Sequence, residues 1–252
     1  MADRFLRSSN PGLNDKTFAS QPLVGLGAER MTVQGAVNKS FLLLVVLMAG
    51  AFWPWSQYLS TGDASVVALP LMAGLIGGLV LAVIMSFKPA MATYLAIPYA
   101  ALEGLAMGAI SATLERRYPG IAIQAVGATF AVFAAMLIAY RTGLIRATER
   151  FRAVVVGATL AIALFYLLTM VLGFFHVNTS GMFNGSALGI GISLAVILVA
   201  ALNLILDFDI MESGAARGAP KYMEWFSAFG LLVTLVWLYV EILRLLANTR
   251  RN

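Results

Sequence analysis

Three carboxylates stand within or at the end of long apolar runs, where charged groups are rare. Glu103 lies in the middle of one run, and Asp207 and Asp209 end another. A charged side chain at the centre of a membrane helix costs about 2.5–3.5 kcal/mol on insertion scales, so such residues mark function by default. Carboxylate oxygens suit a hard cation such as Ca²⁺, and carboxylates that share a site titrate closer to neutral pH. Asp207, Asp209 and Glu103 could therefore offer transient contacts to such a cation, controlled by protonation.

Asp207 and Asp209 are two positions apart, so on a helix they point about 200° away from each other. Only one of them can face the interior of a helical bundle. We expect Asp207 to act as a pH sensor and Asp209 to have a supporting role. The alternative is that both simply end the helix among solvated head groups, although the helix dipole disfavours acids at a C-terminus.

Glu103 is predicted to lie near the bilayer midplane, because about eleven apolar-run residues precede it and about ten follow. Its carboxyl group should face the bundle interior, toward the last helix, and Gly104 and Gly108 would let another helix pass close by. Two roles remain open. Glu103 is either a neutral group that hydrogen-bonds a neighbouring helix or part of an ion or proton path.

The last apolar run carries three further polar residues that could contribute to a gate. Thr234 falls near mid-depth and Glu241 near the outer boundary of the span. Arg244 follows Glu241 by three residues, a spacing at which two helical side chains meet. The pair is either an interfacial ion pair without further function or a part of the gate.

The composition places these residues in a membrane protein. Of 252 residues, 60% are hydrophobic and 12% are charged, whereas soluble proteins are about 25% charged. The apolar runs are each long enough to cross the bilayer as a helix and predict an all-α, seven-transmembrane bundle. They lie near 38–59, 66–87, 92–113, 121–141, 152–175, 185–207 and 224–246.

The runs also define the domain organisation. We expect a flexible polar cytoplasmic tail over 1–36, a transmembrane domain over 37–247 and a short basic tail over 248–252. Within the second run, Gly74, Gly77 and Gly78 form a small-residue face. Such a face favours close helix packing over a mobile seam.

The basic residues predict the orientation. With the N-terminus in the cytoplasm, 12 of the 17 Lys and Arg residues fall in cytoplasmic segments, as the positive-inside rule requires. This distribution indicates a multi-pass membrane protein with a cytoplasmic N-terminus, and the lack of cysteine fits a bacterial membrane protein. Seven crossings place the C-terminus outside; the alternative is a seventh segment that re-enters.

Several classes of function are not indicated. The sequence has no cysteine, and it lacks the zinc-protease, phosphate-loop and nucleophile-elbow motifs. The net charge of +5 comes from basic residues between apolar runs, which is a topology signal and not a nucleic-acid site. We expect neither an enzyme nor a bound cofactor.

The order of short motifs along the chain resembles the Bax inhibitor motif family, in its bacterial YccA-like branch. The resemblance covers nearly all of residues 31–246. The motifs are Met31-Thr32-x-x-Gly35-x-x-x-Lys39, Leu102-Glu103-Gly104-x-x-x-Gly108-x-Ile110-Ser111, Arg141-Thr142-Gly143, Leu206-Asp207-Phe208-Asp209-Ile210, and a last span ending in Tyr239-Val240-Glu241-Ile242-Leu243-Arg244.

The resemblance implies a bundle with the last helix central. It also implies a calcium leak gated by pH through two aspartates, on the sixth and seventh spans, with a basic residue near the end of the second. Asp207 matches the first aspartate, and Lys88 is one position from the basic residue. Thr234 stands at the second aspartate's place and cannot titrate near neutral pH, so Glu103 is our candidate for the missing carboxylate.

The predicted function is a pH-sensitive leak or exchange of a cation, with Ca²⁺ as the expected ion. An alternative from another class is a regulator that binds membrane proteases or other membrane proteins. The tail of residues 1–36 would then be its contact arm. Beyond these, the lipid bilayer is the expected partner.

Overall fold

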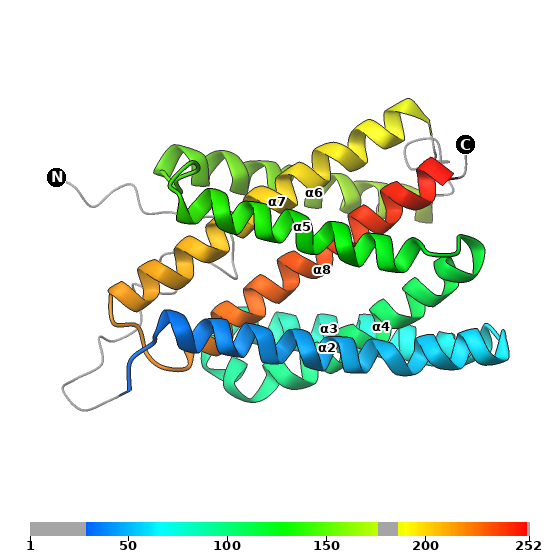
Figure 1. The fold of residues 1–252 in the computed structure, drawn as a ribbon, viewed down its shortest axis with the longest axis horizontal. Coiled ribbons are helices and arrows are strands. Elements are labelled where there is room, and N and C mark those ends of the chain that lie inside the picture. Colours follow the sequence, from blue (N-terminus) through cyan, green and yellow to red (C-terminus); the bar gives the residue numbers. More distant parts are fainter. Residues whose placement is uncertain (1–28, 176–185, 251–252) are drawn as a thin grey trace. The chain divides into compact units, whose positions relative to one another are not determined.

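A computed structural model describes residues 29–175 and 186–250, and in this part of the chain it is built of long helices (Figure 1). Seven helices in these residues are each long and apolar enough to cross a membrane, which confirms the predicted all-α, seven-transmembrane fold class. A 3₁₀ turn, η1 (Pro89–Met91), precedes α4. The helices are α2 (Val33–Thr61), α3 (Ser65–Phe87), α4 (Ala92–Arg117), α5 (Ile121–Arg141), α6 (Glu149–Phe174), α7 (Ala187–Ala216) and α8 (Met223–Arg250).

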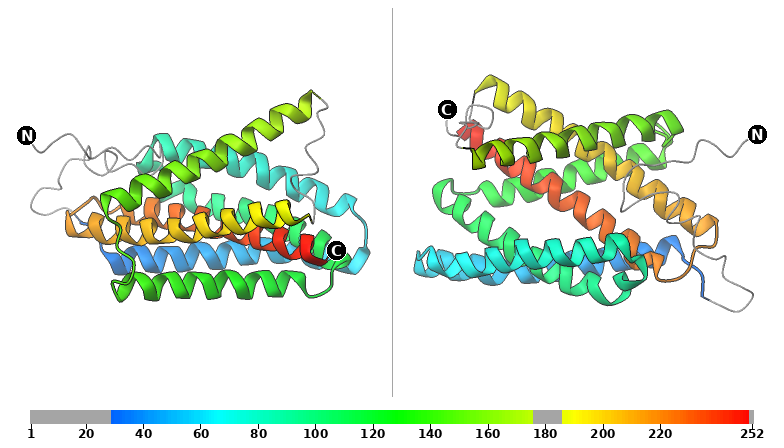
Figure 2. Two further views of the ribbon diagram at one scale, coloured as in Figure 1. Left: turned by 90° about the horizontal axis from the view of Figure 1, so that it is seen from above. Right: turned by 180° about the vertical axis from the view of Figure 1, so that it is seen from behind.

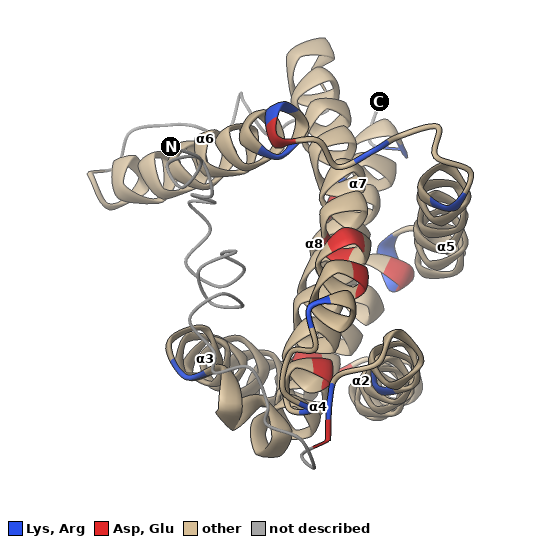
Figure 3. Cartoon of the chain, turned by 90° about the vertical axis from the view of Figure 1, so that its left-hand side faces the viewer, with Lys and Arg blue, Asp and Glu red and all other residues tan. Residues whose placement is uncertain are grey.

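The helix ends differ most from the predicted apolar runs at the start of α2 and at the end of α7. Most of the predicted tail, residues 1–28, lies outside the described residues, and α2 begins at Val33. α7 continues to Ala216, well past the end of its apolar run at Asp207. Lys, Arg, Asp and Glu occupy few positions along the helices (Figure 3).

The helices form two compact units. Of the described residues, the first contains 29–117 and 207–233, and the second contains 118–175, 186–206 and 234–250. α7 and α8 each contribute to both units. α8 is also the most buried span, at 67% of its apolar window against 11% for α2 and for α6.

In the first unit, α4 packs against α2 through glycines. A Cβ added at Gly108 would lie 2.1 Å from the carbonyl oxygen of Ala51, and one at Gly104 would lie 2.3 Å from that of Leu47. The two backbones are therefore in direct contact, which only glycine permits at these positions. The predicted close approach of a helix to Gly104 and Gly108 is confirmed, and the helix is α2.

α4 also packs on α3, through the side opposite to the one that contacts α2 (Figure 2). A Cβ at Gly74 would lie 2.5 Å from the carbonyl oxygen of Leu102 and 2.6 Å from the Cβ of Ala106. A Cβ at Gly77 would meet the side chain of Leu102 at 2.9 Å. The small-residue face of α3 is thus a packing face, as predicted.

In the second unit, polar contacts join helices that are otherwise apolar. The amide of Asn203 on α7 donates to the hydroxyl of Thr159 on α6 at 2.8 Å. The guanidinium of Arg250, at the end of α8, donates to the carbonyl of Pro119 at 2.9 Å and to the side-chain oxygen of Gln124 at 2.8 Å. These bonds fix α6 to α7 and the end of α8 to the beginning of α5.

Candidate functional site

Asp207 and Asp209 lie inside α7, not at its end. Asp207 is buried, with 4% of its surface exposed, and Asp209 is half-buried. This difference agrees with the two side chains pointing in different directions. Because α7 runs on to Ala216, the alternative in which both aspartates merely end the helix does not fit.

Glu103 lies at the contact between α4 and α3. It is half-buried, and a Cβ at Gly78 of α3 would come within 2.8 Å of its carboxylate oxygen. Tyr99, one turn earlier on α4, packs its ring edge-to-face on Phe229 of α8 at 5.0 Å. We expected the Glu103 carboxylate to face the last helix, whereas the contact that the structure shows is with Gly78 of α3, whose glycine face makes room for the side chain.

Lys88 is exposed at the end of α3, where its backbone N–H donates to the carbonyl of Ile84 at 2.8 Å. It belongs to the first unit, together with Glu103 and Asp207. Within residues 29–175 and 186–250, no three His, Cys, Asp or Glu side chains gather closely enough to hold a metal ion. Ca²⁺ contact at Asp207, Asp209 and Glu103 stays a prediction.

The second unit contains Thr234, which is buried, and a hydrogen-bonded triad near the end of α8. Glu241 is 1% exposed and accepts from the hydroxyl of Tyr166 on α6 at 2.7 Å. Arg244 donates to the same hydroxyl at 2.8 Å and to the Glu241 carboxylate at 3.1 and 3.3 Å. Its guanidinium also lies 5.3 Å from the centre of the Tyr166 ring.

This triad shows that the ion pair expected from the spacing of Glu241 and Arg244 is formed. It also adds a partner that sequence reasoning missed. Tyr166 stands in an apolar run, where an aromatic residue gives no signal of a polar contact. The triad ties α6 to α8 because Tyr166 donates to one member and accepts from the other.

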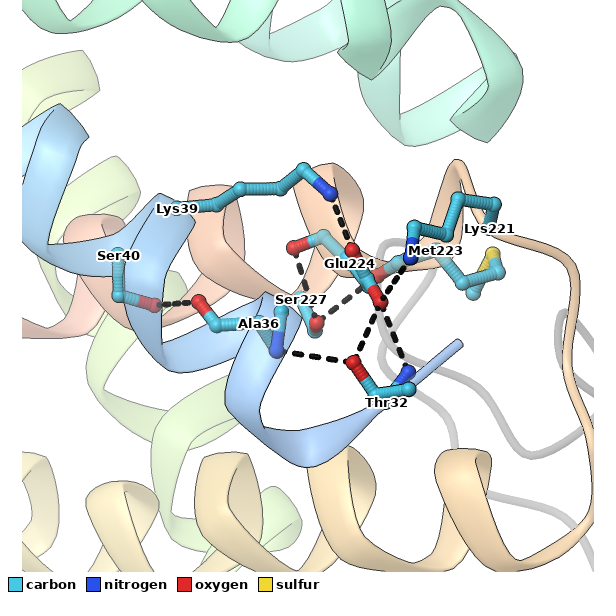
Figure 4. Close-up of polar contacts among 9 residues, drawn as sticks. Thr32, Ala36, Lys39, Ser40, Lys221, Met223, Glu224 and Ser227 are labelled. Carbon is cyan, nitrogen blue, oxygen red and sulfur yellow. Dashed lines mark hydrogen bonds and ion pairs between the residues drawn. The ribbon is translucent and has the colours of Figure 1, made fainter. Parts of the chain in front are cut away.

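Sequence reasoning also missed Glu224, a fully buried carboxylate in the first turn of α8 (Figure 4). It accepts from the backbone N–H of Thr32 at 2.8 Å and from its hydroxyl at 2.9 Å. The ammonium group of Lys39 forms an ion pair with it, and that of Lys221 lies 3.4 Å away. The only available signal was an acid and a lysine inside separate apolar spans.

Glu224 also explains the spacing of the first motif. Thr32 caps α2 by accepting from the N–H of Gly35 at 3.0 Å. A Cβ at Gly35 would lie 2.2 Å from the Glu224 carboxylate. Lys39, one turn further along, completes the surroundings. The residues Thr32, Gly35 and Lys39 are thus spaced so that each meets one carboxylate.

Glu103→Gln separates the two roles left open for Glu103. The substitution keeps the shape and hydrogen bonding of the side chain but removes its charge. A neutral role predicts a change in unfolding free energy below about 1 kcal/mol, since one hydrogen bond contributes about that much, with cation flux unchanged. A path role predicts loss of flux or of its pH dependence from a folded protein. Thermal unfolding in detergent and flux into proteoliposomes measure both.

Comparison with known proteins assigns the chain to a family. The sequence model of the family described as Bax inhibitor 1 like matches residues 7–251, nearly the whole chain. No curated protein and no solved structure matches it. With seven apolar helices and this match, the chain is a multi-pass membrane protein that belongs to the Bax inhibitor 1 like family.

Proposed function

We propose that this protein is a pH-sensitive cation leak channel or exchanger of a bacterial inner membrane, with Ca²⁺ as the transported ion. The observation that carries the proposal is the burial of Asp207 inside a membrane-spanning helix. A buried carboxylate in a span is costly and is retained where it binds, gates or relays a charge. No chemical reaction is part of the proposal.

Protonation supplies the control. An ionised carboxylate attracts a cation, and its protonated form does not, so a change of pH alters both binding and local contacts. Glu103 is the second carboxylate in the proposal because it lies at a helix contact in the same unit as Asp207. Thr234 and Glu241 belong to the other unit and are the further gate residues of the proposal, with Arg244 in a supporting role.

The distribution of basic residues supports a cytoplasmic N-terminus.

Ca²⁺ flux into proteoliposomes, followed with a trapped indicator across a pH series, tests the proposal. Removal of residues 1–28 leaves Thr32 and α2 intact and distinguishes the regulator hypothesis. A leak keeps its flux without those residues, whereas the absence of flux from the full-length, folded protein at every pH contradicts the proposal.

Asp207→Asn is expected to abolish most of the pH dependence of the flux. The amide keeps the size and hydrogen bonding of the side chain but cannot titrate, whereas one carboxylate changes its ionised fraction up to about tenfold per pH unit. Asp209→Asn is the matched control, because Asp209 is two positions away and more exposed. If both variants keep the pH profile of the parent, Asp207 is not the sensor.

A further inference from the structure

The Glu224 carboxylate lies where two distant parts of the first unit meet. The start of α2 provides Thr32 and Lys39, and the connection between α7 and α8 provides Lys221. Thr32 lies 192 positions and Lys39 lies 185 positions from Glu224 along the chain. Glu224 is therefore the point where the beginning of the first span is joined to the beginning of the last.

The surroundings of the Glu224 carboxylate favour a negative charge. It faces the N-terminus of α2, where the helix dipole and the free backbone N–H groups favour an anion. Gly35 provides the room, and Lys39 is held over the ring of Trp225 at 5.3 Å. The Lys39 side chain is only 17% exposed, so leaving its charge without this carboxylate would be unfavourable, whereas the Lys221 side chain is 44% exposed.

Next to Glu224, the backbone before α2 pairs with the α7–α8 connection over only a short stretch. The N–H of Met31 donates to the carbonyl of Ala219 at 2.7 Å, and Arg30 forms an isolated antiparallel bridge with Pro220. Such a bridge is too short to hold two segments together without other contacts. The contacts of Glu224 thus supply the charge-dependent part of the attachment.

We propose that Glu224 is a latch: its charge holds the start of α2 against the α7–α8 connection, and neutralising it releases that segment. The charged groups that face Glu224 are Lys39 from α2 and Lys221 from the connection, while Thr32 supplies neutral donors. Because the attraction requires an ionised carboxylate, the latch is closed near neutral pH and opens as the pH falls. This proposal stands independently of ion conduction.

The absence of cysteine from the sequence allows a direct test. Met31→Cys introduces a single thiol at a position that is 2% exposed beside the latch. Gln34→Cys introduces one at an exposed position a turn away, as the control. The readout is the ratio of the two rates of labelling by a water-soluble maleimide, measured at the same pH so that the intrinsic reactivity of thiols cancels.

Glu224→Gln in the Met31→Cys protein is expected to raise this ratio at least about tenfold through local opening. Gly35→Ala should raise it similarly with the charge retained, because the added methyl group would lie 2.2 Å from the carboxylate oxygen. In the protein with Glu224 intact, the ratio should stay constant from about pH 8 to about pH 5 and rise only below about pH 4, and in Glu224→Gln it should not change with pH.

An unchanged ratio in both variants would show that packing, and not the carboxylate, holds the start of α2. A pH-dependent rise that persists in Glu224→Gln would assign the opening to another group. If Glu224→Gln does not yield folded protein, the pH series on the Met31→Cys protein decides alone. A constant ratio down to about pH 3 then overturns the latch.

Discussion

A single methyl group added at Gly108 is expected to destabilise the folded protein by roughly 3 kcal/mol, the upper end of the usual cost of overpacking. The added Cβ would lie 2.1 Å from the carbonyl oxygen and 2.7 Å from the Cα of Ala51. These are backbone atoms, so no side chain can rotate away, and α2 must move as a whole. The loss of the monodisperse species on heating in detergent measures the effect.

Gly127→Ala on α5 is the matched control, because a Cβ at Gly127 meets no atom within 4 Å. This substitution should leave the stability unchanged or raise it by up to about 1 kcal/mol, since alanine is the better helix former. Equal stability losses in the two variants would contradict a backbone contact between α2 and α4. The pair thus tests the arrangement within the first unit without any assay of function.

Arg244→Met is expected to destabilise the protein by about 3 kcal/mol. Glu241 would then be a buried carboxylate without its cation, and breaking a buried ion pair costs about 3–5 kcal/mol. We expect the lower end of that range because 36% of the Arg244 side chain is exposed. Tyr166 continues to donate to the carboxylate at 2.7 Å and compensates in part.

The double variant Glu241→Leu with Arg244→Met should recover most of that loss. Replacing both members of a buried pair by apolar residues is often neutral or stabilising. Thermal unfolding of the parent, both single variants and the double variant gives the coupling free energy of the pair. A double variant as unstable as the sum of the singles would mean that the two charges do not compensate each other.

The spans and their small-residue faces could be predicted because both are local patterns. Each of the seven apolar runs can be recognised from about 20 consecutive residues, and the spacing of Gly74 and Gly78 indicates a packing face. The end of α7 could not be predicted in this way. The helix continues from Asp207 to Ala216 through polar residues, where hydrophobicity no longer reports on helical structure.

Long-range polar partners were beyond the reach of the sequence. Glu224 has the appearance of an ordinary acid in a first helical turn, which the helix dipole alone would explain. Its true partner Lys39 lies 185 residues away. Likewise Glu241 could be paired with Arg244 from their spacing, whereas Tyr166 lies 75 residues from Glu241.

The lengths of α2 and α8 have a consequence for where the latch sits in the bilayer. Their 29 and 28 residues correspond to about 42–44 Å at about 1.5 Å per residue, against about 30 Å of hydrocarbon. A centred, untilted helix of this length extends roughly 6 Å into the head groups at each end. Glu224, in the first turn of α8, then lies at the level of the lipid phosphates, where anionic lipids attract protons and lysines alike. Hydrophobic mismatch thereby becomes a second influence on the latch: a thicker bilayer draws both helix ends into hydrocarbon, where separated charges cost more, and so keeps the carboxylate and its lysines together.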